Sequence, residues 1–91
     1  MFTLSLTRDC CAFIKGLDSK PARQVYERIL GLCEDPKPQN AKPLVAHKGL
    51  WRMRVGDFRV IYSIEDNRVN IVIVDRRNDD EVYKRIERLS A

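Results

Sequence analysis

Residues 51–62 alternate apolar and basic side chains around a central turn signal: Trp51-Arg52-Met53-Arg54-Val55-Gly56-Asp57-Phe58-Arg59-Val60-Ile61-Tyr62. Successive side chains of a strand point to opposite faces, so this pattern predicts one apolar and one basic face. Gly56-Asp57 is suited to a two-residue hairpin loop. We therefore expect two antiparallel strands. Their apolar face carries Trp51, Met53, Val55, Val60 and Tyr62, and their basic face carries Arg52, Arg54 and Arg59.

The predicted hairpin places Arg54 directly opposite Arg59. Like charges in that position destabilise a sheet, and a bound anion would relieve the repulsion. The planar guanidinium group is well suited to bidentate phosphate contacts. The pattern therefore favours a phosphate-binding face, and so nucleic acid, over the alternative of a solvated sheet surface. Lys48, in the loop before the hairpin, is a further candidate phosphate contact.

The composition is that of a single globular domain spanning residues 1–91. The chain is 44% hydrophobic and 33% charged, and none of its apolar runs approaches the roughly 20 residues that cross a bilayer. The N-terminus lacks the features of a signal peptide, so we expect a cytoplasmic protein without membrane association. Three cysteines, two of them adjacent, favour neither a disulfide framework nor a zinc site. We expect no metal and no cofactor.

Positive charge is concentrated in the middle of the chain. Residues 42–78 carry eight basic and four acidic residues, a net charge of +4. This equals the net charge of the whole chain, which is also +4. Residues 1–41 carry a net charge of +1 and residues 79–91 a net charge of −1, so the two flanking segments cancel each other. A local basic surface attracts polyanions and speeds their encounter with the protein.

The flanking segments predict helices and further strands. Phe2–Thr7 alternates as an edge strand or a half-buried strand does, and residues 8–17 have helical spacing. A second helix is expected after Ser19 as its N-cap, with Pro21 in the first turn. The region from Pro36 to about Leu50 is expected to be a loop.

The remaining elements complete an α+β fold. Val69–Val74 is nearly continuously apolar, as in a central strand, and Asp79-Asp80 suits the start of a final helix. The expected order is an N-terminal strand, a helical hairpin, a three-stranded antiparallel meander and a C-terminal helix. The helices would cover the apolar face, and the arginine face would remain open, floored partly by Ile61 and Val72.

A second basic group ends the central strand at Asp75-Arg76-Arg77-Asn78. Alternation does not separate Arg76 from Arg77, and a polar strand end with local Asp–Arg pairing is an equally good interpretation. Tyr83, in the predicted last helix, is either a boundary residue or a residue that stacks on a base or accepts a proton. Nearby arginines would favour its phenolate form.

Two of these motifs resemble those of RelE-type toxins of the RelE/ParE superfamily. Leu50 to Tyr62 is similar to that family's central motif, and Asp75 to Arg85 to its terminal motif, a basic pair followed by Val-Tyr. The order of predicted elements also matches, so the likeness covers essentially the whole chain and implies a RelE-like fold. The resemblance implies a toxin of a type II toxin–antitoxin system that enters the ribosomal A site and cuts mRNA without a metal.

The resemblance also implies roles for individual residues. Arg59, Arg77 and Tyr83 match the catalytic positions, and Arg52, Arg54, Lys48 and Arg76 would contact RNA phosphates. Arginine is a poor proton acceptor because it is essentially always charged, so the proton of the attacking 2′-hydroxyl would go to Tyr83 or to water.

The implied partners are a cognate antitoxin, acidic and RelB-like, the ribosome with its mRNA, and operator DNA bound by the complex. Two alternatives to the endoribonuclease stay open. One is a ParE-like toxin that inhibits gyrase, and the other is a non-catalytic nucleic-acid-binding module.

Overall fold

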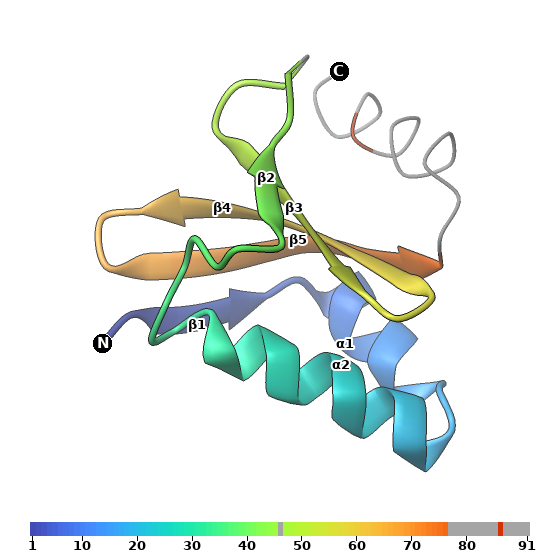
Figure 1. The fold of residues 1–91 in the computed structure, drawn as a ribbon. Coiled ribbons are helices and arrows are strands. Elements are labelled where there is room, and N and C mark those ends of the chain that lie inside the picture. The colour runs from blue at the N-terminus through green and yellow to red at the C-terminus, as the bar shows by residue number, and fades with distance from the viewer. Residues whose placement is uncertain (46, 77–85, 87–91) are drawn as a thin grey trace.

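The computed structural model describes residues 1–45, 47–76 and 86 (Figure 1). Its elements are β1 (Thr3–Leu6), α1 (Arg8–Lys15), α2 (Ser19–Gly31), β2 (Ala41–Pro43), β3 (Leu50–Val55), β4 (Phe58–Glu65) and β5 (Arg68–Arg76). The predicted strand, helical hairpin and three-stranded meander are thereby confirmed. The predicted final helix lies outside the described residues, except for Ile86.

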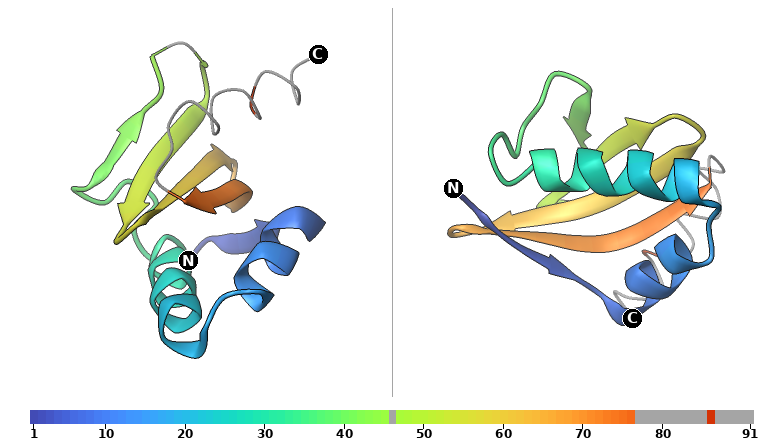
Figure 2. Two further views of the ribbon diagram at one scale, coloured as in Figure 1. Left: turned by 90° about the vertical axis from the view of Figure 1, so that its right-hand side faces the viewer. Right: turned by 90° about the horizontal axis from the view of Figure 1, so that it is seen from below.

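The strands form one mixed sheet in the order β1-β5-β4-β3-β2. β1 runs parallel to β5, whereas β5, β4, β3 and β2 pair antiparallel. Both helices lie on the same side of the sheet, below the strands in Figure 1, and Figure 2 (right) shows α2 in front of the strands. We call the side that they cover the helix face.

The main core lies between the helices and this side of the sheet. The side chains of Met53, Val55, Val60 and Tyr62 are each at most 1% exposed and pack in one cluster with residues of α2. Trp51 is partly buried against the same cluster. The apolar face predicted from alternation is therefore confirmed, and its burial stabilises the sheet through the hydrophobic effect.

The helix boundaries differ slightly from the predicted ones. α1 ends at Lys15 rather than Leu17, because the chain tightens there and the Leu17 N–H donates to the Ile14 carbonyl at 3.1 Å. Ser19 is the first residue of α2 and Asp18 is its N-cap, so the prediction of Ser19 as N-cap was wrong by one residue.

The predicted loop between α2 and β3 contains a short edge strand. β2 pairs antiparallel with β3, with Ala41 opposite Met53 and Lys42 opposite Arg52. Proline is tolerated at an edge because one side of the strand needs no donor, so Pro43 does not prevent this pairing. The prediction of a continuous loop was therefore wrong over Ala41–Pro43.

A β-bulge lies in the pairing of β4 with β5. Ile61 is opposite Ile73, whereas Tyr62 is opposite Ile71, which leaves Val72 as an extra residue on β5. The extra residue changes the parity of the strand. Ile71 and Val74 consequently both belong to the core cluster on the helix face, although three positions separate them.

The other side of the sheet carries a second, smaller core. Ile61 and Ile73 are each 1% exposed and pack with Leu44 and Ile86, which are 7% and 2% exposed. Val72 is partly buried against this cluster. The prediction of an open face over Ile61 was therefore wrong, because Leu44 and Ile86 cover part of it.

Candidate nucleic-acid interface

The hairpin register places two arginines side by side across β3 and β4. Gly56, with a φ of +56°, and Asp57 form the two-residue loop, and Arg54 is the direct partner of Arg59. This opposition is the one predicted from the sequence. Both side chains belong to the side of the sheet away from the helices, because Met53, Val55 and Val60 fill the helix face.

The third strand adds a carboxylate to this row of charges. Arg59 is paired with Asp75 on β5, on the side opposite to Arg54. Arg59 is partly buried and its Nη1 atom is inaccessible to solvent, whereas Arg54 is exposed. An acid directly across the strand pair attracts Arg59. Asp75 therefore offsets part of the repulsion between the two arginines.

A second pair of like charges lies at the edge of the sheet. Lys42 on β2 is opposite Arg52 on β3, and Arg52 in turn is opposite Ile61. Lys42 is exposed and Arg52 is partly buried. With Lys42 added to the three arginines predicted from the sequence, the basic face consists of Lys42, Arg52, Arg54 and Arg59. Lys42 was not a predicted site residue, because the expected loop gave it no position relative to Arg52.

Lys48 and Arg76 are the other described residues that were predicted to contact phosphates. Lys48 is exposed in the turn before β3, where Gly49 adopts a φ of +88°. Arg76 is opposite Phe58, and its guanidinium carbon lies 5.4 Å from the centre of the Phe58 ring. Phe58 belongs to the core on the helix face. The structure therefore places Arg76 beside Phe58 at the end of β5, and its contact with phosphate stays a prediction.

Arg77 and Tyr83 lie outside the described residues. Ile86, three positions after Tyr83, is buried in the second core with Ile61 and Ile73. Ile86 therefore lies on the same side of the sheet as the basic face.

Tyr62 and Trp51 pack in the core on the helix face. The Tyr62 side chain is fully buried, and its hydroxyl donates a hydrogen bond to the Pro36 carbonyl at 2.7 Å. Burial raises the pKa of Tyr62 to about 12, and the nearby Asp35 carboxylate adds to this effect. The Lys37 ammonium lies 5.2 Å from the Trp51 ring centre. These contacts confirm Tyr62 as a core residue.

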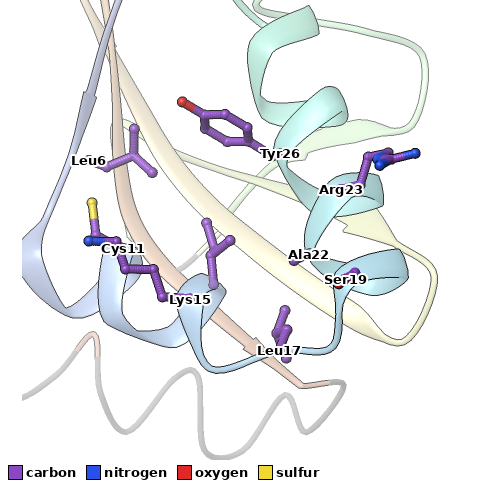
Figure 3. A pocket seen from close by; sticks show the side chains of 9 residues that line it. Leu6, Cys11, Lys15, Leu17, Ser19, Ala22, Arg23 and Tyr26 are labelled. Atoms are coloured by element: carbon purple, nitrogen blue, oxygen red, sulfur yellow. The ribbon is translucent and has the colours of Figure 1, made fainter.

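A groove opens between the two helices (Figure 3). Its volume is about 610 Å³, and Leu6, Ile14, Leu17 and Tyr26 give it a largely apolar lining. Lys15 and Arg23, both exposed, contribute the basic groups. Tyr26 is 48% exposed although it is aromatic, so the groove presents apolar surface to solvent.

Neither metal binding nor membrane spanning is indicated by the described residues. Across residues 1–45, 47–76 and 86, no three His, Cys, Asp or Glu side chains gather where they could hold a metal ion. Neither of the helices within those ranges is long and apolar enough to cross a membrane.

The family model for the ParE toxin of the type II toxin–antitoxin system matches residues 7–81. The chain belongs to this family, which is part of the RelE/ParE superfamily.

Solved structures show the same fold. The RelE–RelB complex from Pyrococcus horikoshii is similar with a TM-score of 0.75 and 24% identity, covering 85% of this chain and 96% of that chain. The RelBE2 complex from Mycobacterium tuberculosis gives a TM-score of 0.71 and 27% identity, covering 84% and 98%. The ParDE system of P. aeruginosa gives 0.70 and 17%, covering 86% and 98%. Comparison with curated proteins gives no match.

The chain is thus a toxin of a type II toxin–antitoxin system with a RelE-like fold. Similar structures include both RelE and ParE toxins. The fold therefore does not identify the target of the toxin, and the target has to be inferred from the chemistry of the site.

Proposed function

We propose that the protein is a ribosome-dependent endoribonuclease that cuts mRNA in the A site without a metal ion. The observation that carries this proposal is the basic face, where two pairs of like charges lie directly opposite each other across three strands. A sheet tolerates such repulsion at a cost, and a bound phosphate chain would relieve it. The protein would act in the cytoplasm, where ribosomes and mRNA are found.

The proposed reaction is an intramolecular transesterification of the RNA. The 2′-oxygen of one nucleotide bonds to the adjacent phosphorus, and the bond from phosphorus to the 5′-oxygen breaks. The products carry a 2′,3′-cyclic phosphate and a 5′-hydroxyl. Arg59 and Arg77 would hold the phosphate and stabilise its developing negative charge, as preorganised electrostatics requires.

Proton transfer needs a different residue. A guanidinium group remains protonated near neutral pH, so neither Arg52 nor Arg54 can accept the proton of the 2′-hydroxyl. We assign this role to Tyr83, whose phenolate form nearby arginines would favour, with base stacking as its alternative role. One of Arg59 and Arg77 would donate a proton to the leaving 5′-oxygen and regain a proton from solvent.

The position of Ile86 supports these assignments. Ile86 is buried beside Ile61 and Ile73, and Ile61 is the strand partner of Arg52. Tyr83 is three residues before this anchor in the sequence. Because Ile86 and Arg59 share one side of the sheet, we expect Tyr83 to lie near the basic face.

An antitoxin is the expected partner. The similar structures from Pyrococcus horikoshii and Mycobacterium tuberculosis are toxin–antitoxin complexes. We propose an acidic, RelB-like antitoxin with an amphipathic segment. The groove between α1 and α2 fits such a segment, because its lining is apolar and Lys15 and Arg23 provide positive charge. The complex would also bind operator DNA.

The test is a translating extract supplied with the purified full-length chain. We expect mRNA fragments with 5′-hydroxyl ends at codons occupying the A site. Tyr83→Phe should cut much more slowly, whereas Tyr26→Phe, on α2, should cut at the wild-type rate. Stalled ribosomes with intact mRNA would exclude the nuclease.

Inhibition of gyrase is the second candidate function. The matching family model describes ParE toxins, and the ParDE system of P. aeruginosa shares the fold. Such a toxin needs no ribonuclease site, so the arginines of the basic face would have no evident role in it. Loss of DNA supercoiling by purified gyrase, with mRNA left intact in the extract, would establish this function in place of RNA cleavage.

A further inference from the structure

We propose that Lys42 and Arg52 form a binding site for one phosphate of a single-stranded RNA, next to the phosphate held at Arg54 and Arg59. The site deepens the proposed nuclease function and rests on it. The starting observation is the pairing of β2 with β3, which makes Lys42 and Arg52 direct cross-strand partners. Their Cβ atoms are therefore expected about 4.5–5.5 Å apart, with both side chains on the basic face.

The two rows of positive charge differ in their surroundings. The row through Arg54 and Arg59 continues to the carboxylate of Asp75. The row through Lys42 and Arg52 continues instead to Ile61 and Ile73, which are apolar and buried. Within residues 1–45, 47–76 and 86, neither Lys42 nor Arg52 has an ion pair. In the described sheet, the positive charge of Lys42 and Arg52 is therefore not offset by a carboxylate in the same row.

The backbone holds the edge pair in place. The Leu44 N–H donates to the Leu50 carbonyl at 2.9 Å, just beyond the paired residues of β2 and β3. The Leu44 side chain is buried in the second core beside Ile61. At the other end, the Asn40 amide donates to the Arg54 carbonyl at 3.1 Å. A rigid position keeps the two cations together before a ligand binds, which lowers the entropy lost on binding.

The spacing of the rows fits a phosphodiester chain. Arg52 and Arg54 are two residues apart on β3, so the rows are separated by roughly 6.8 Å along the strand. Adjacent phosphates of an extended single strand can bridge such a span, with one phosphate at each row. A guanidinium beside an ammonium provides both a bidentate donor and a point charge for a phosphate. The regular spacing of RNA phosphates fits these two rows of positive charge better than the scattered carboxylates of an acidic protein do.

The experiment measures binding of a short fluorescein-labelled RNA whose 2′-hydroxyls are methylated, so that it binds without being cut. For Lys42→Gln we expect the dissociation constant to rise about fivefold at about 0.1 M salt, with the slope of log affinity against log salt shallower by about 0.7. Lys42→Arg should retain wild-type binding. Lys20→Gln, which removes the same charge from exposed α2, should also leave binding unchanged.

Two results would overturn the site while leaving the nuclease function intact. One is wild-type RNA binding with an unchanged salt slope in Lys42→Gln. The other concerns polyglutamate, used as a model of an acidic protein. If Lys42→Gln loses binding to polyglutamate but keeps its binding to RNA, the pair serves an acidic protein partner. A wild-type chain that fails to bind the RNA would instead overturn the RNA-binding basis of the nuclease proposal as well as the site.

Discussion

Arg59 has a charged neighbour on each side, Arg54 on β3 and Asp75 on β5. The cation repels it and the carboxylate attracts it, so the sheet depends on Asp75 to hold two arginines together. The same carboxylate repels an incoming phosphate. Stability and RNA binding should therefore respond in opposite directions to a change at position 75.

Asp75→Asn tests this opposition. The amide retains an oxygen for the bond now donated by the Arg76 N–H at 2.7 Å, so the change removes charge but little structure. We expect the free energy of unfolding to fall by about 0.2–1 kcal/mol and RNA affinity to rise. Urea unfolding and fluorescence anisotropy measure the two effects. The exposed control Glu34→Gln should alter both far less, and equal effects in the two variants would contradict the pairing.

Tyr62 provides a prediction about pH. Its pKa is raised to about 12 in the folded state, whereas an unfolded tyrosine titrates near 10. Its protonated form therefore stabilises the fold fully below about pH 10, and this contribution is lost as the pH rises from about 10 to 12. Tyr62→Phe leaves the Pro36 carbonyl without its donor.

We expect Tyr62→Phe to lower the free energy of unfolding by about 0.5–1.5 kcal/mol below pH 10. The difference from wild type should shrink between pH 10 and 12, because phenylalanine has no proton to lose. Urea unfolding at several pH values measures the difference. A gap that stays constant over this range would show that the hydroxyl does not titrate as proposed.

Among the elements, the β3–β4 hairpin depends on the conformation of one glycine. Gly56 has a φ of +56°, and a Cβ built there would meet only the Gln24 side chain, at an ordinary contact distance of 3.5 Å. Backbone conformation rather than crowding therefore decides the outcome. Gly56→Ala should lower the free energy of unfolding by about 1–2 kcal/mol. It should also weaken RNA binding by loosening the register of Arg54 and Arg59.

The matched control is Gly31→Ala at the end of α2, where the added Cβ meets nothing within 4 Å and φ is not positive. Alanine there should raise the free energy of unfolding by about 0.5–1 kcal/mol. Thermal unfolding measures both variants. A stabilising Gly56→Ala would contradict the strained turn.

The elements that local patterns encode were predictable from the sequence. Alternation and a glycine turn were enough to predict the β3–β4 register. β2 was missed because its three residues include Pro43 and have no periodicity of their own. It exists through pairing with β3, which is a tertiary contact. The bulge at Val72 was missed for the same reason, because its position is defined only by the partner strand.

At the scale of the whole molecule, the sheet separates two cores of unequal size. The larger one follows from alternation along β3 and β4 and was predicted. The smaller one combines Leu44 from the β2–β3 connection with Ile86 from near the C-terminus. Residues so distant in sequence share no periodic pattern, so their contact could not be inferred. The same limit applied to Lys42, whose place on the basic face follows only from the pairing of β2.

The second core links stability to the proposed chemistry, because it anchors the chain just after Tyr83. Ile86→Ala should therefore slow cleavage more than Ile29→Ala, which empties part of the core on the helix face. Each deletion is expected to cost about 2–5 kcal/mol, so cleavage is compared at a low temperature where circular dichroism shows both variants folded. Binding of the methylated RNA should be retained in both, because Lys42 and Arg52 are unchanged. Equal loss of cleavage in the two variants would mean that Ile86 contributes only stability, and that the proposed role of Tyr83 does not depend on this anchor.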